Sequence, residues 1–482
     1  MLFNSVTFLL FFSSIATISW MLPRTLRLYL LFSSSIVFYG FWRIEFIFLM
    51  MASVILDYFL ALKIHHSSEQ KVKKILLIIS IAFNIGFLLF FKYLLFFADN
   101  FVGLLSIAGF DLEIDPFFFN IILPLGISFY TFQTISYTVD VYRGFIKPEK
   151  EFVLFATYVT FFPQLVAGPI LRAREVIPQL NIKPLFKFQD LKVGLRRIIF
   201  GLFLKVVLAD NIAPLVDIGF SSEANLLSAI DVWTLSFLFG FQIYFDFAAY
   251  SFIAIGCARV MGMTFPENFN FPYSSDSPKE FWKRWHISLS SWIRDYLYLP
   301  LTGAKVQDRS IGGITPVPSD STNYALFLTW ALMGLWHGAS WTFVFWGIYH
   351  AVLIYIHRLI SPFIKKSIFY KINLGLLVTL PFMMLGWISF RAEDLNTTFI
   401  LLSKVLNFNQ YFSLGLRENN YIVTFLITFG VLIAKPLYEY LANLENKNLT
   451  KFLIAETVIY CFTVPLIFVF LRPITQFIYF QF

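Results

Sequence analysis

Long runs of apolar residues recur along the whole chain and are separated by short polar segments. A run of about 18 or more such residues is long enough for an α-helix to cross a bilayer. No stretch has the composition of a soluble domain. The pattern therefore predicts an all-α, polytopic integral membrane protein with about ten to twelve transmembrane or re-entrant helices.

Segment 152–171 (FVLFATYVTFFPQLVAGPIL) departs from this pattern. Pro163 and the pair Gly168-Pro169 break helices, and basic residues flank the segment on both sides. Both ends are therefore expected on the same side of the membrane, which predicts a re-entrant segment. Its irregular backbone would have to be buried in protein or line a cavity. The alternative is a kinked helix that crosses the membrane once.

Segment 324–357 contains no Lys, Arg, Asp or Glu, although both of its flanks are basic. It is long enough to enter the membrane and return as two short or tilted helices. His337 lies near its middle, and an ionisable residue at membrane depth indicates function. Gly334 and Gly338, four residues apart, would let another backbone approach closely.

A buried imidazole stays neutral and can accept a proton, so His337 is a candidate general base. The alternative is a core histidine that is hydrogen-bonded to a carbonyl group. We assign that structural role to His350 and His357, which lie in the same segment.

Residues 277–301 predict a capped, strongly amphipathic helix. Ser277 is a good N-cap, Pro278 suits the first helical position and Glu280 completes a capping box. At 100° per residue one face is aromatic and the other basic. The aromatic face holds Phe281, Trp285, Leu289, Trp292 and Tyr296, and the basic face holds Lys279, Lys283, His286, Ser290 and Arg294.

Two interpretations of this helix stay open. It could lie on the cytoplasmic surface with its cations at lipid headgroups, or its basic face could line the mouth of a reaction cavity that receives an anionic donor. Helical geometry alone favours the first interpretation, and His286 on the basic face weakens that preference. Asp246, inside another apolar run, also needs a partner or water. We expect either a structural ion pair with Lys205 or Arg259, or a place beside the cavity.

Composition and charge narrow the classes of function. Hydrophobic residues make up 58% of the chain and charged residues 14%, against roughly 25% charged in soluble domains. The net charge is +8, and the basic residues lie in short loops between the apolar runs. This arrangement is typical of membrane topology rather than of nucleic-acid binding. Cys257 and Cys461, both in apolar runs, permit no disulfide framework and are expected to serve in packing. No spacing of histidines and carboxylates suggests a metal site.

The basic loops also predict an orientation, because they favour the cytoplasmic side. The N-terminus is then outside, the apolar stretch 1–22 is a retained first span, and the acidic segment 98–116 faces the exterior. There is no convincing internal repeat of the kind found in many transporters.

Several motifs match, in order, the membrane-bound O-acyltransferase family. The chain resembles most closely its bacterial branch, which includes the alginate O-acetyltransferase membrane subunit. The matching segments are LPLGISFYTFQTISYTVDVYRG (123–144), FFPQLVAGPI (161–170), YFDF (244–247), FPENFNFPY (265–273), FWKRWHISLSSWIRDYLYLPL (281–301), MGLWHGASWTFVFWGIYH (333–350) and FIYFQF (477–482). One departure is Phe252, which stands where related sequences carry an acidic residue. It leaves the identity of the acceptor or partner open.

The resemblance implies roles for individual residues. His337 matches the family's catalytic histidine, and His286 matches the second position of the active-site pair. Acetyl-CoA would be the cytoplasmic donor rather than a bound cofactor, and Lys283 and Arg294 are candidates to bind its phosphates. A periplasmic or extracellular acyltransferase partner would pass the acyl group to a polysaccharide acceptor. No nucleic acid and no metal is implied.

The sequence thus predicts a single O-acyltransferase domain over 1–482 in the bacterial cytoplasmic (inner) membrane. It has N-terminal spans in 1–142, a catalytic core at about 152–360 and C-terminal spans in 372–482. The expected function is O-acetylation of an exported cell-envelope polysaccharide, either alginate-like or peptidoglycan. The alternatives are D-alanyl transfer to teichoic acid and a non-enzymatic polytopic transporter.

Overall fold

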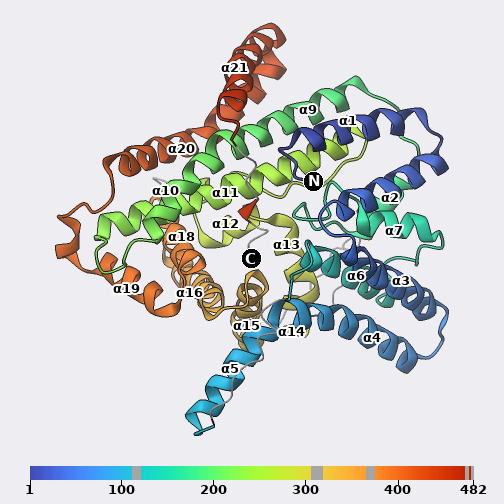
Figure 1. The fold of residues 1–482 in the computed structure, drawn as a ribbon, viewed down its shortest axis with the longest axis horizontal. Helices are drawn as coiled ribbons and strands as arrows, with labels where there is room; N and C mark the ends of the chain where they lie inside the picture. Colours follow the sequence, from blue (N-terminus) through green and yellow to red (C-terminus); the bar gives the residue numbers. More distant parts are fainter. Residues whose placement is uncertain (111–120, 305–318, 365–374, 473–476, 479–482) are drawn as a thin grey trace. The chain divides into compact units, whose positions relative to one another are not determined.

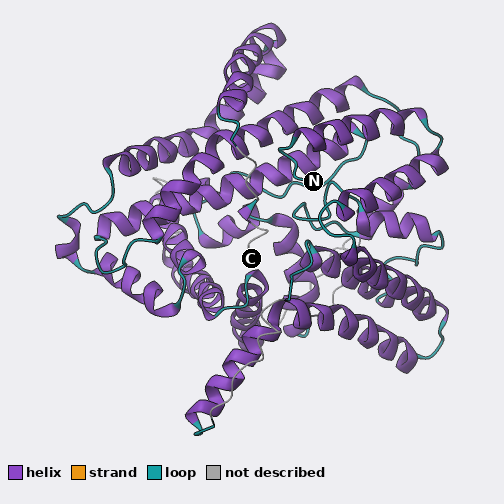
Figure 2. Ribbon diagram, viewed as in Figure 1, coloured by secondary structure: helices purple, strands orange, loops and turns teal. Residues whose placement is uncertain are grey.

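The computed structural model describes residues 1–110, 121–304, 319–364, 375–472 and 477–478. Within these ranges the regular structure is helical throughout, without strands (Figure 2). The predicted all-α class is confirmed. Three features discussed above lie wholly or partly outside the described residues. They are the acidic segment 98–116, the basic flanks at 305–318 and 365–374, and the end of the FIYFQF motif.

Seven of the described helical segments are long and apolar enough to cross a membrane. They are Glu45–His66, Gln70–Ile107, Phe188–Phe220, Ala229–Val260, Trp341–Phe363, Glu418–Lys447 and Leu449–Val469. Three further apolar helices are shorter: Val6–Met21, Gly375–Arg391 and Leu395–Leu406. The chain is therefore a multi-pass membrane protein. The seven full-length spans found among the described residues are somewhat fewer than the ten to twelve transmembrane or re-entrant helices expected.

The described chain divides into two compact units. The first contains residues 1–197 and 254–266. Its helices are α1 (Val6–Met21), α2 (Arg24–Gly40), α3 (Glu45–His66), α4 (Gln70–Leu88), the π-helical turn η1 (Leu89–Tyr93), α5 (Leu94–Ile107), α6 (Ile127–Tyr142), α7 (Phe152–Thr160), α8 (Ala173–Leu180) and most of α9 (Phe188–Leu202) (Figure 1).

A buried polar cluster joins three helices of the first unit. Asp57 of α3 is fully buried and accepts hydrogen bonds from Ser80 and Asn84 of α4, the latter at 2.7 Å. Thr134 and Thr138 of α6 complete the cluster, with Thr134 Oγ1 3.2 Å from Asn84 Oδ1. Since an unpaired polar group costs most in an apolar interior, the cluster fixes how these helices pack.

Segment 152–171 is interrupted as its prolines and glycine predicted. α7 ends at Thr160, and the chain then runs through a buried, non-helical stretch until α8 begins at Ala173. Nine residues of helix extend only about 14 Å, less than the thickness of a bilayer. The buried side chain of Gln164 donates to the carbonyl of Tyr158 at 2.9 Å and so satisfies part of the irregular backbone.

The second unit contains residues 198–253, 267–304 and the described residues from 319 onwards. It comprises the π-helical segment η3 (Phe203–Ala209), α10 (Asp210–Phe220), most of α11 (Ala229–Val260), η4 (Pro272–Ser274), α12 (Pro278–Arg284), α13 (Ile287–Ile293), η5 (Arg294–Tyr298), α14 (Leu299–Leu301), α15 (Ser319–His337), α16 (Trp341–Ile364), α18 (Gly375–Arg391), α19 (Leu395–Leu406), η7 (Phe408–Tyr411), α20 (Glu418–Lys447) and α21 (Leu449–Val469).

Helices α15 and α16 form the expected hairpin, and they are in close contact along their length (Figure 1). A Cβ atom at Gly334 would clash with the carbonyl oxygen of Phe343, and one at Gly347 with the carbonyl oxygen of Trp330. Glycine is therefore required for this backbone-to-backbone contact. Gly338 instead makes room for the Phe343 ring rather than for a backbone.

The amphipathic stretch 277–301 is not one helix, which corrects the prediction. The Ser277 side chain caps α12 as expected by accepting from the Glu280 amide. α12 then ends at Arg284, and α13 starts only at Ile287. His286 between them has φ 42°, a left-handed conformation that interrupts a helix. Because the break rotates α13 relative to α12, His286 does not lie on the exposed basic face.

Candidate functional site

His337 is the last residue of α15 and lies beside the turn of the hairpin. Its side chain is buried and packed among aromatic rings. The ring centroids of Trp336, Trp346 and Phe390 lie 4.9, 5.0 and 5.3 Å from that of His337. Three helices, α15, α16 and α18, thus build the surroundings of this imidazole.

His286 is buried as well, with 1% of its surface exposed. Its ring lies 4.6 Å from that of Phe247 and 6.3 Å from that of Trp336. Burial lowers the pKa of the His286 imidazole to about 3, so the ring is neutral at physiological pH. Both predicted site histidines therefore pack against the same residue, Trp336. His337 is its neighbour in α15, and His286 comes from the connection between α12 and α13.

Asn268 determines which nitrogen of His286 holds the proton. Its Oδ1 accepts from the Ser288 amide at 3.3 Å and the Ser288 hydroxyl at 2.8 Å, which identifies this atom as the carbonyl oxygen. The same oxygen lies 3.1 Å from His286 Nδ1. Since a carbonyl oxygen can only accept, Nδ1 must donate, and Nε2 of the neutral ring is then a hydrogen-bond acceptor. Sequence reasoning did not single out Asn268, although it lies in the FPENFNFPY motif.

The two candidate donor-binding cations, Lys283 and Arg294, are exposed. Lys283 belongs to α12, and Arg294, which is paired with Asp295 at 2.8 Å, begins η5. Lys279 of α12 is also exposed. The basic character predicted for this stretch is therefore retained at its surface, while His286 is turned inward.

His350 does not have the carbonyl partner expected of it. Its side chain is fully buried, and within the described residues neither ring nitrogen has a hydrogen-bond partner. It lies against the rings of Trp282 and Trp346, both at 4.9 Å, and closely approaches Gly386. His350 is thus a packing residue. The same packing role holds for Cys257, which is buried, but is wrong for Cys461, which is exposed.

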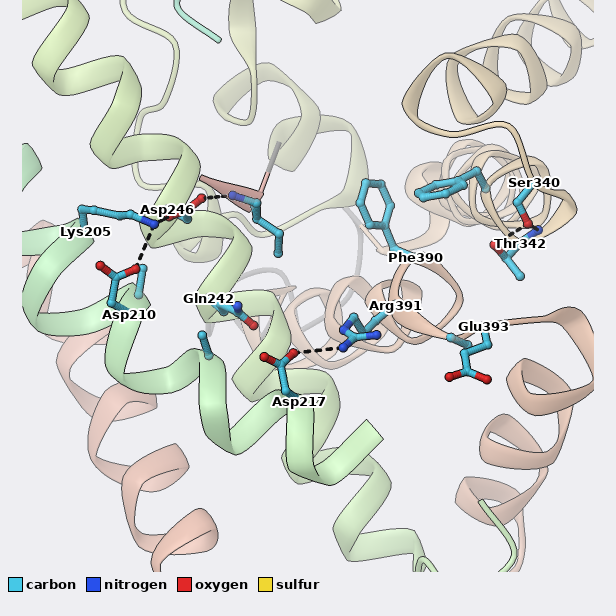
Figure 3. A pocket seen from close by; sticks show the side chains of 15 residues that line it. Lys205, Asp210, Asp217, Gln242, Asp246, Ser340, Thr342, Phe390, Arg391 and Glu393 are labelled. Atoms are coloured by element: carbon cyan, nitrogen blue, oxygen red, sulfur yellow. Dashed lines mark hydrogen bonds and ion pairs between the residues drawn. The ribbon is translucent and has the colours of Figure 1, made fainter. Parts of the chain in front are cut away.

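A polar cavity of about 380 Å³ lies beside the hairpin turn in the second unit (Figure 3). This volume is within the range of small-molecule sites, roughly 300–1,000 Å³. Helices α10, α11, α16 and α18 contribute its walls. The lining consists of Lys205, Ala209, Asp210, Ala213, Asp217, Gln242, Asp246, Ser340, Thr342, Phe343, Phe390, Arg391, Ala392, Glu393 and Ile478.

Asp246 has both of the roles considered for it. Its carboxylate pairs with Lys205 Nζ at 2.6 Å, and the same ammonium group lies 2.8 Å from Asp210. The ion pair with Lys205 is the predicted structural role, and the position in the cavity wall is the predicted place beside a cavity. Near the C-terminus, the Ile478 amide donates to Asp246 at 2.5 Å, and the Phe477 ring covers Lys205 at 4.5 Å. Phe252, the departure noted in the sequence, packs against Phe200 at 5.1 Å.

Phe390 connects the cavity to the histidines, because it lines the cavity and also contacts His337. His337 is thus linked through Trp336 to His286 and through Phe390 to the cavity. A proton acceptor that contacts residues of two such regions suits transfer of a group between two substrates. Gln242, Asp217 and Arg391 of the cavity were missed in the sequence, because no local pattern distinguishes them from other polar residues within helices or near helix ends.

Comparison with known proteins gives one family match and several similar proteins. The pattern of the membrane-bound O-acyltransferase family matches residues 150–390. The chain is 34% identical over 443 residues to the peptidoglycan O-acetyltransferase of Helicobacter pylori, covering 85% of this chain and 80% of that protein. It is 36% identical to a probable alginate O-acetylase of Azotobacter vinelandii, covering 85% and 79%. A teichoic acid D-alanyltransferase of Bacillus subtilis is 30% identical over 285 residues, covering 57% of this chain and 70% of that protein.

Proposed function

This chain belongs to the membrane-bound O-acyltransferase family, and on that basis we propose that it transfers an acetyl group from a cytoplasmic thioester to a hydroxyl group, for O-acetylation of an exported cell-envelope polysaccharide. The observation that supports this most directly is the place of His337. It lies at the hairpin turn, where Trp336 contacts both His337 and His286, and Phe390 contacts His337 and lines a polar cavity.

His337 would act as the general base. The acceptor hydroxyl attacks the thioester carbonyl carbon while His337 takes the hydroxyl proton. The tetrahedral intermediate then collapses, the carbon–sulfur bond breaks, and the proton passes from the imidazole to the leaving thiolate. An oxygen ester and a free thiol result, and His337 is neutral again. The aromatic rings around His337 exclude water, which would otherwise hydrolyse the thioester.

His286 would orient the reacting groups. In the tautomer held by Asn268 its Nε2 is an acceptor, so it can receive a hydrogen bond from the attacking hydroxyl or from the imidazole of His337. It cannot donate one to a developing oxyanion from that atom. His286 could orient the reacting groups or stabilise the developing charge. Its hydrogen bond with Asn268 favours the orienting role.

The donor would be acetyl-CoA, bound on the side of α12 and α13. Exposed Lys283 and Arg294 are suited to its phosphates, because cations form strong, charge-assisted hydrogen bonds to phosphate oxygens. The acceptor hydroxyl would reach His337 from the cavity. If basic loops are cytoplasmic, the hairpin turn and the cavity beside it are directed away from that side. Donor and acceptor then meet at His337 from opposite sides.

The names of the relatives support the choice of polysaccharide. The most extensive of the reported alignments are to a peptidoglycan O-acetyltransferase and to a probable alginate O-acetylase. We therefore propose a peptidoglycan or alginate-like acceptor in the bacterial envelope, reached through a periplasmic or extracellular acyltransferase partner, and a place in the cytoplasmic (inner) membrane. D-alanyl transfer is the second candidate, but its relative aligns over only 57% of this chain.

The decisive experiment measures acetyl groups on isolated envelope polysaccharide from cells that express wild type, His337→Ala, His286→Ala or His350→Ala at equal levels in the membrane. His350 is the matched control, since it is a second buried histidine of the same hairpin with only packing contacts. We expect acetylation to be lost in His337→Ala, reduced in His286→Ala and retained in His350→Ala. Normal acetylation in inserted His337→Ala protein would refute the catalytic assignment.

A further inference from the structure

The connection between α8 and α9 exposes large apolar side chains next to lysines. We call residues 181–188 the α8–α9 loop, and α9 begins at its last residue. Four apolar side chains of the loop are exposed: Ile182 (59%), Leu185 (82%), Phe186 (58%) and Phe188 (72%). Lys183 and Lys187, which lie between them in the sequence, are exposed as well. A group of exposed apolar side chains with polar neighbours is typical of an interaction surface.

Buried groups of the first unit hold the start of this loop in place. Arg27 of α2 is 2% exposed and donates to the carbonyl oxygens of Ile182, at 3.3 Å, and Met261, at 2.9 Å. Arg24 donates to the carbonyl oxygen of Asn181 at 3.3 Å. Because guanidinium groups donate in a rigid planar geometry, the two arginines fix the path of the loop backbone.

Packing holds the middle of the loop. The Phe186 ring lies 5.3 Å from that of Trp20 at the end of α1, edge to face. Trp20 Nε1 in turn donates to the carbonyl oxygen of Val260 at 3.1 Å. A Cβ atom at Gly262 would lie 2.8 Å from both Pro184 and Trp20, so the contact between them is close. The apolar side chains are therefore presented outward by a supported loop.

The ends of three helices place the loop at the boundary of the membrane. The apolar span Phe188–Phe220 starts directly at the loop. α1 ends at Met21 and α11 ends at Val260, and Trp20 connects both ends to the loop. The loop thus lies where the hydrocarbon region meets the headgroups, a depth at which tryptophan is enriched. The basic residues around it predict the cytoplasmic side.

The protein does not neutralise the two lysines of the loop. Arg259, at the end of α11, pairs with Asp190 at 2.8 Å. Lys183 and Lys187 take part in no ion pair among the residues that the structure describes. Uncompensated cations beside exposed apolar groups fit a surface that offers acyl chains and negative headgroups together. A neutral lipid would cover the apolar groups but leave the lysines without a counter-charge.

We infer that the α8–α9 loop is a docking site for anionic phospholipids of the cytoplasmic leaflet. Lys183 and Lys187 contact the headgroup phosphates, and the apolar side chains of the loop enter the acyl-chain region. The site is independent of the proposed function, because the loop belongs to the first unit, whereas His337 and His286 belong to the second.

The test measures which lipid surrounds the loop in the full chain, reconstituted in nanodiscs of phosphatidylcholine and phosphatidylglycerol. A fluorophore on Leu185→Cys, in a Cys461→Ser background, reports quenching by bromine placed on the acyl chains of one lipid at a time. The remaining cysteine, Cys257, is buried. We expect phosphatidylglycerol to be enriched at least fivefold at the label, since each lysine near an anionic surface contributes about that factor. The enrichment should fall at high salt. Equal shares of the two lipids, or no quenching by either, overturns the inference.

A double variant and a second label position are the controls. Lys183→Gln combined with Lys187→Gln should bring the two lipids to equal shares while quenching by phosphatidylcholine remains. A label on Leu10→Cys should show no preference, because Leu10 is 67% exposed on α1 in a stretch without charged side chains. Unchanged enrichment in the double variant, or the same enrichment at Leu10, would contradict the inference.

Binding of the thioester donor is the competing use of the two lysines. If they bind the phosphates of acetyl-CoA instead, adding acetyl-CoA without an acceptor should displace phosphatidylglycerol from the label at Leu185→Cys. We expect the enrichment to stay the same when acetyl-CoA is added. A loss of enrichment would assign the lysines to the donor and overturn the inference. Because no measurement here requires acyl transfer, failure of the proposed function would leave the result intact.

Discussion

Two groups of buried polar side chains, one in each unit, solve the same problem in different ways. In the first unit Asp57 accepts hydrogen bonds from Ser80 and Asn84, with Thr134 and Thr138 completing the cluster. In the second unit Asp246 is held by Lys205, but the group opens onto a cavity that also contains Gln242 and Glu393. The five side chains of the first cluster are all fully buried.

The difference shows what a buried charge indicates in a membrane protein. An ionisable residue in an apolar run has to be compensated, and that requirement alone does not imply catalysis. Asp57 is compensated by neutral donors that join α3, α4 and α6, so its role is to fix packing. Asp246 belongs to a wall that faces open space and lies in the same unit as both site histidines. We expect substitutions to separate the two groups by their effect on transfer and on stability.

The largest effect is expected for His337→Ala. Removing a general base slows transfer by about 10²–10⁴-fold, and we expect the thermal stability of the protein to change far less than the rate. The measurement is the initial rate of acetyl transfer per inserted protein in membranes. If every substitution in the Asp57 cluster keeps a transfer rate near that of wild type, the distinction between a packing cluster and a catalytic site is supported. An equally low transfer rate in Asp57→Asn would contradict that distinction.

Lys205→Met should have the second largest effect, and on stability. It leaves Asp246 and Asp210 buried without their cation, and breaking a buried ion pair from one side costs about 3–5 kcal/mol. The midpoint of thermal unfolding of detergent-solubilised protein measures the loss. Combining Lys205→Met with Asp246→Asn removes one of the two orphaned charges and should recover part of the stability. A double variant less stable than Lys205→Met would contradict this account of the cavity wall.

We expect the burial of His286 to make the stability of the protein depend on pH, with an effect of intermediate size. Burial lowers the pKa of His286 from 6.5 to about 3, so between these values the unfolded chain binds a proton that the folded protein does not. Its contribution to stability is therefore complete above pH 6.5 and falls as the pH decreases toward 3. At pH 5 this residue alone costs about 2 kcal/mol. Unfolding midpoints at pH 7.5 and pH 5.0 should differ less in His286→Gln than in wild type.

The control for that measurement is His65→Gln. His65 lies exposed at the end of α3, so its substitution should keep the full difference between the two midpoints. An identical difference in wild type and His286→Gln would show that His286 is not held neutral by burial.

Asp57→Asn should have the smallest effect. The amide has the shape of the carboxylate and keeps one accepting oxygen, while the hydroxyls of Ser80 and Thr138 can reorient to accept from its NH₂ group. We expect a loss of about 1 kcal/mol in stability and no change in the transfer rate per folded protein. The unfolding midpoint and the transfer assay, measured on the same preparation, check both expectations.

Much of the local structure could be predicted from the sequence. The break after Thr160 follows from the prolines and glycine beyond it, the Ser277 cap from its capping box, and the turn after His337 from a charge-free segment with basic flanks. In each case the cause lies within a few residues along the chain. The site histidines themselves were also identified in this way, although their catalytic roles stay a prediction.

Other features depend on residues far apart in the sequence. The helical periodicity of 277–301 predicted His286 on an exposed face, whereas Asn268 and the left-handed backbone at His286 turn it inward. Asp246 had two candidate cations in the sequence, and packing selected Lys205, while Arg259 pairs with Asp190. The cavity combines α10, α11, α16 and α18, and no local pattern connects Gln242 with Arg391 or Glu393.

The sequence by itself therefore determined that this chain is an all-helical membrane protein, where several of its helices begin and end, and which histidine lies at a membrane-buried turn. These properties follow from hydropathy, helix capping and backbone preference, which act over one or two turns of helix. Only the tertiary structure decided the partner of each buried charge, the tautomer of His286 and the composition of the cavity wall. Those depend on which side chains meet across helices, and long-range packing sets that.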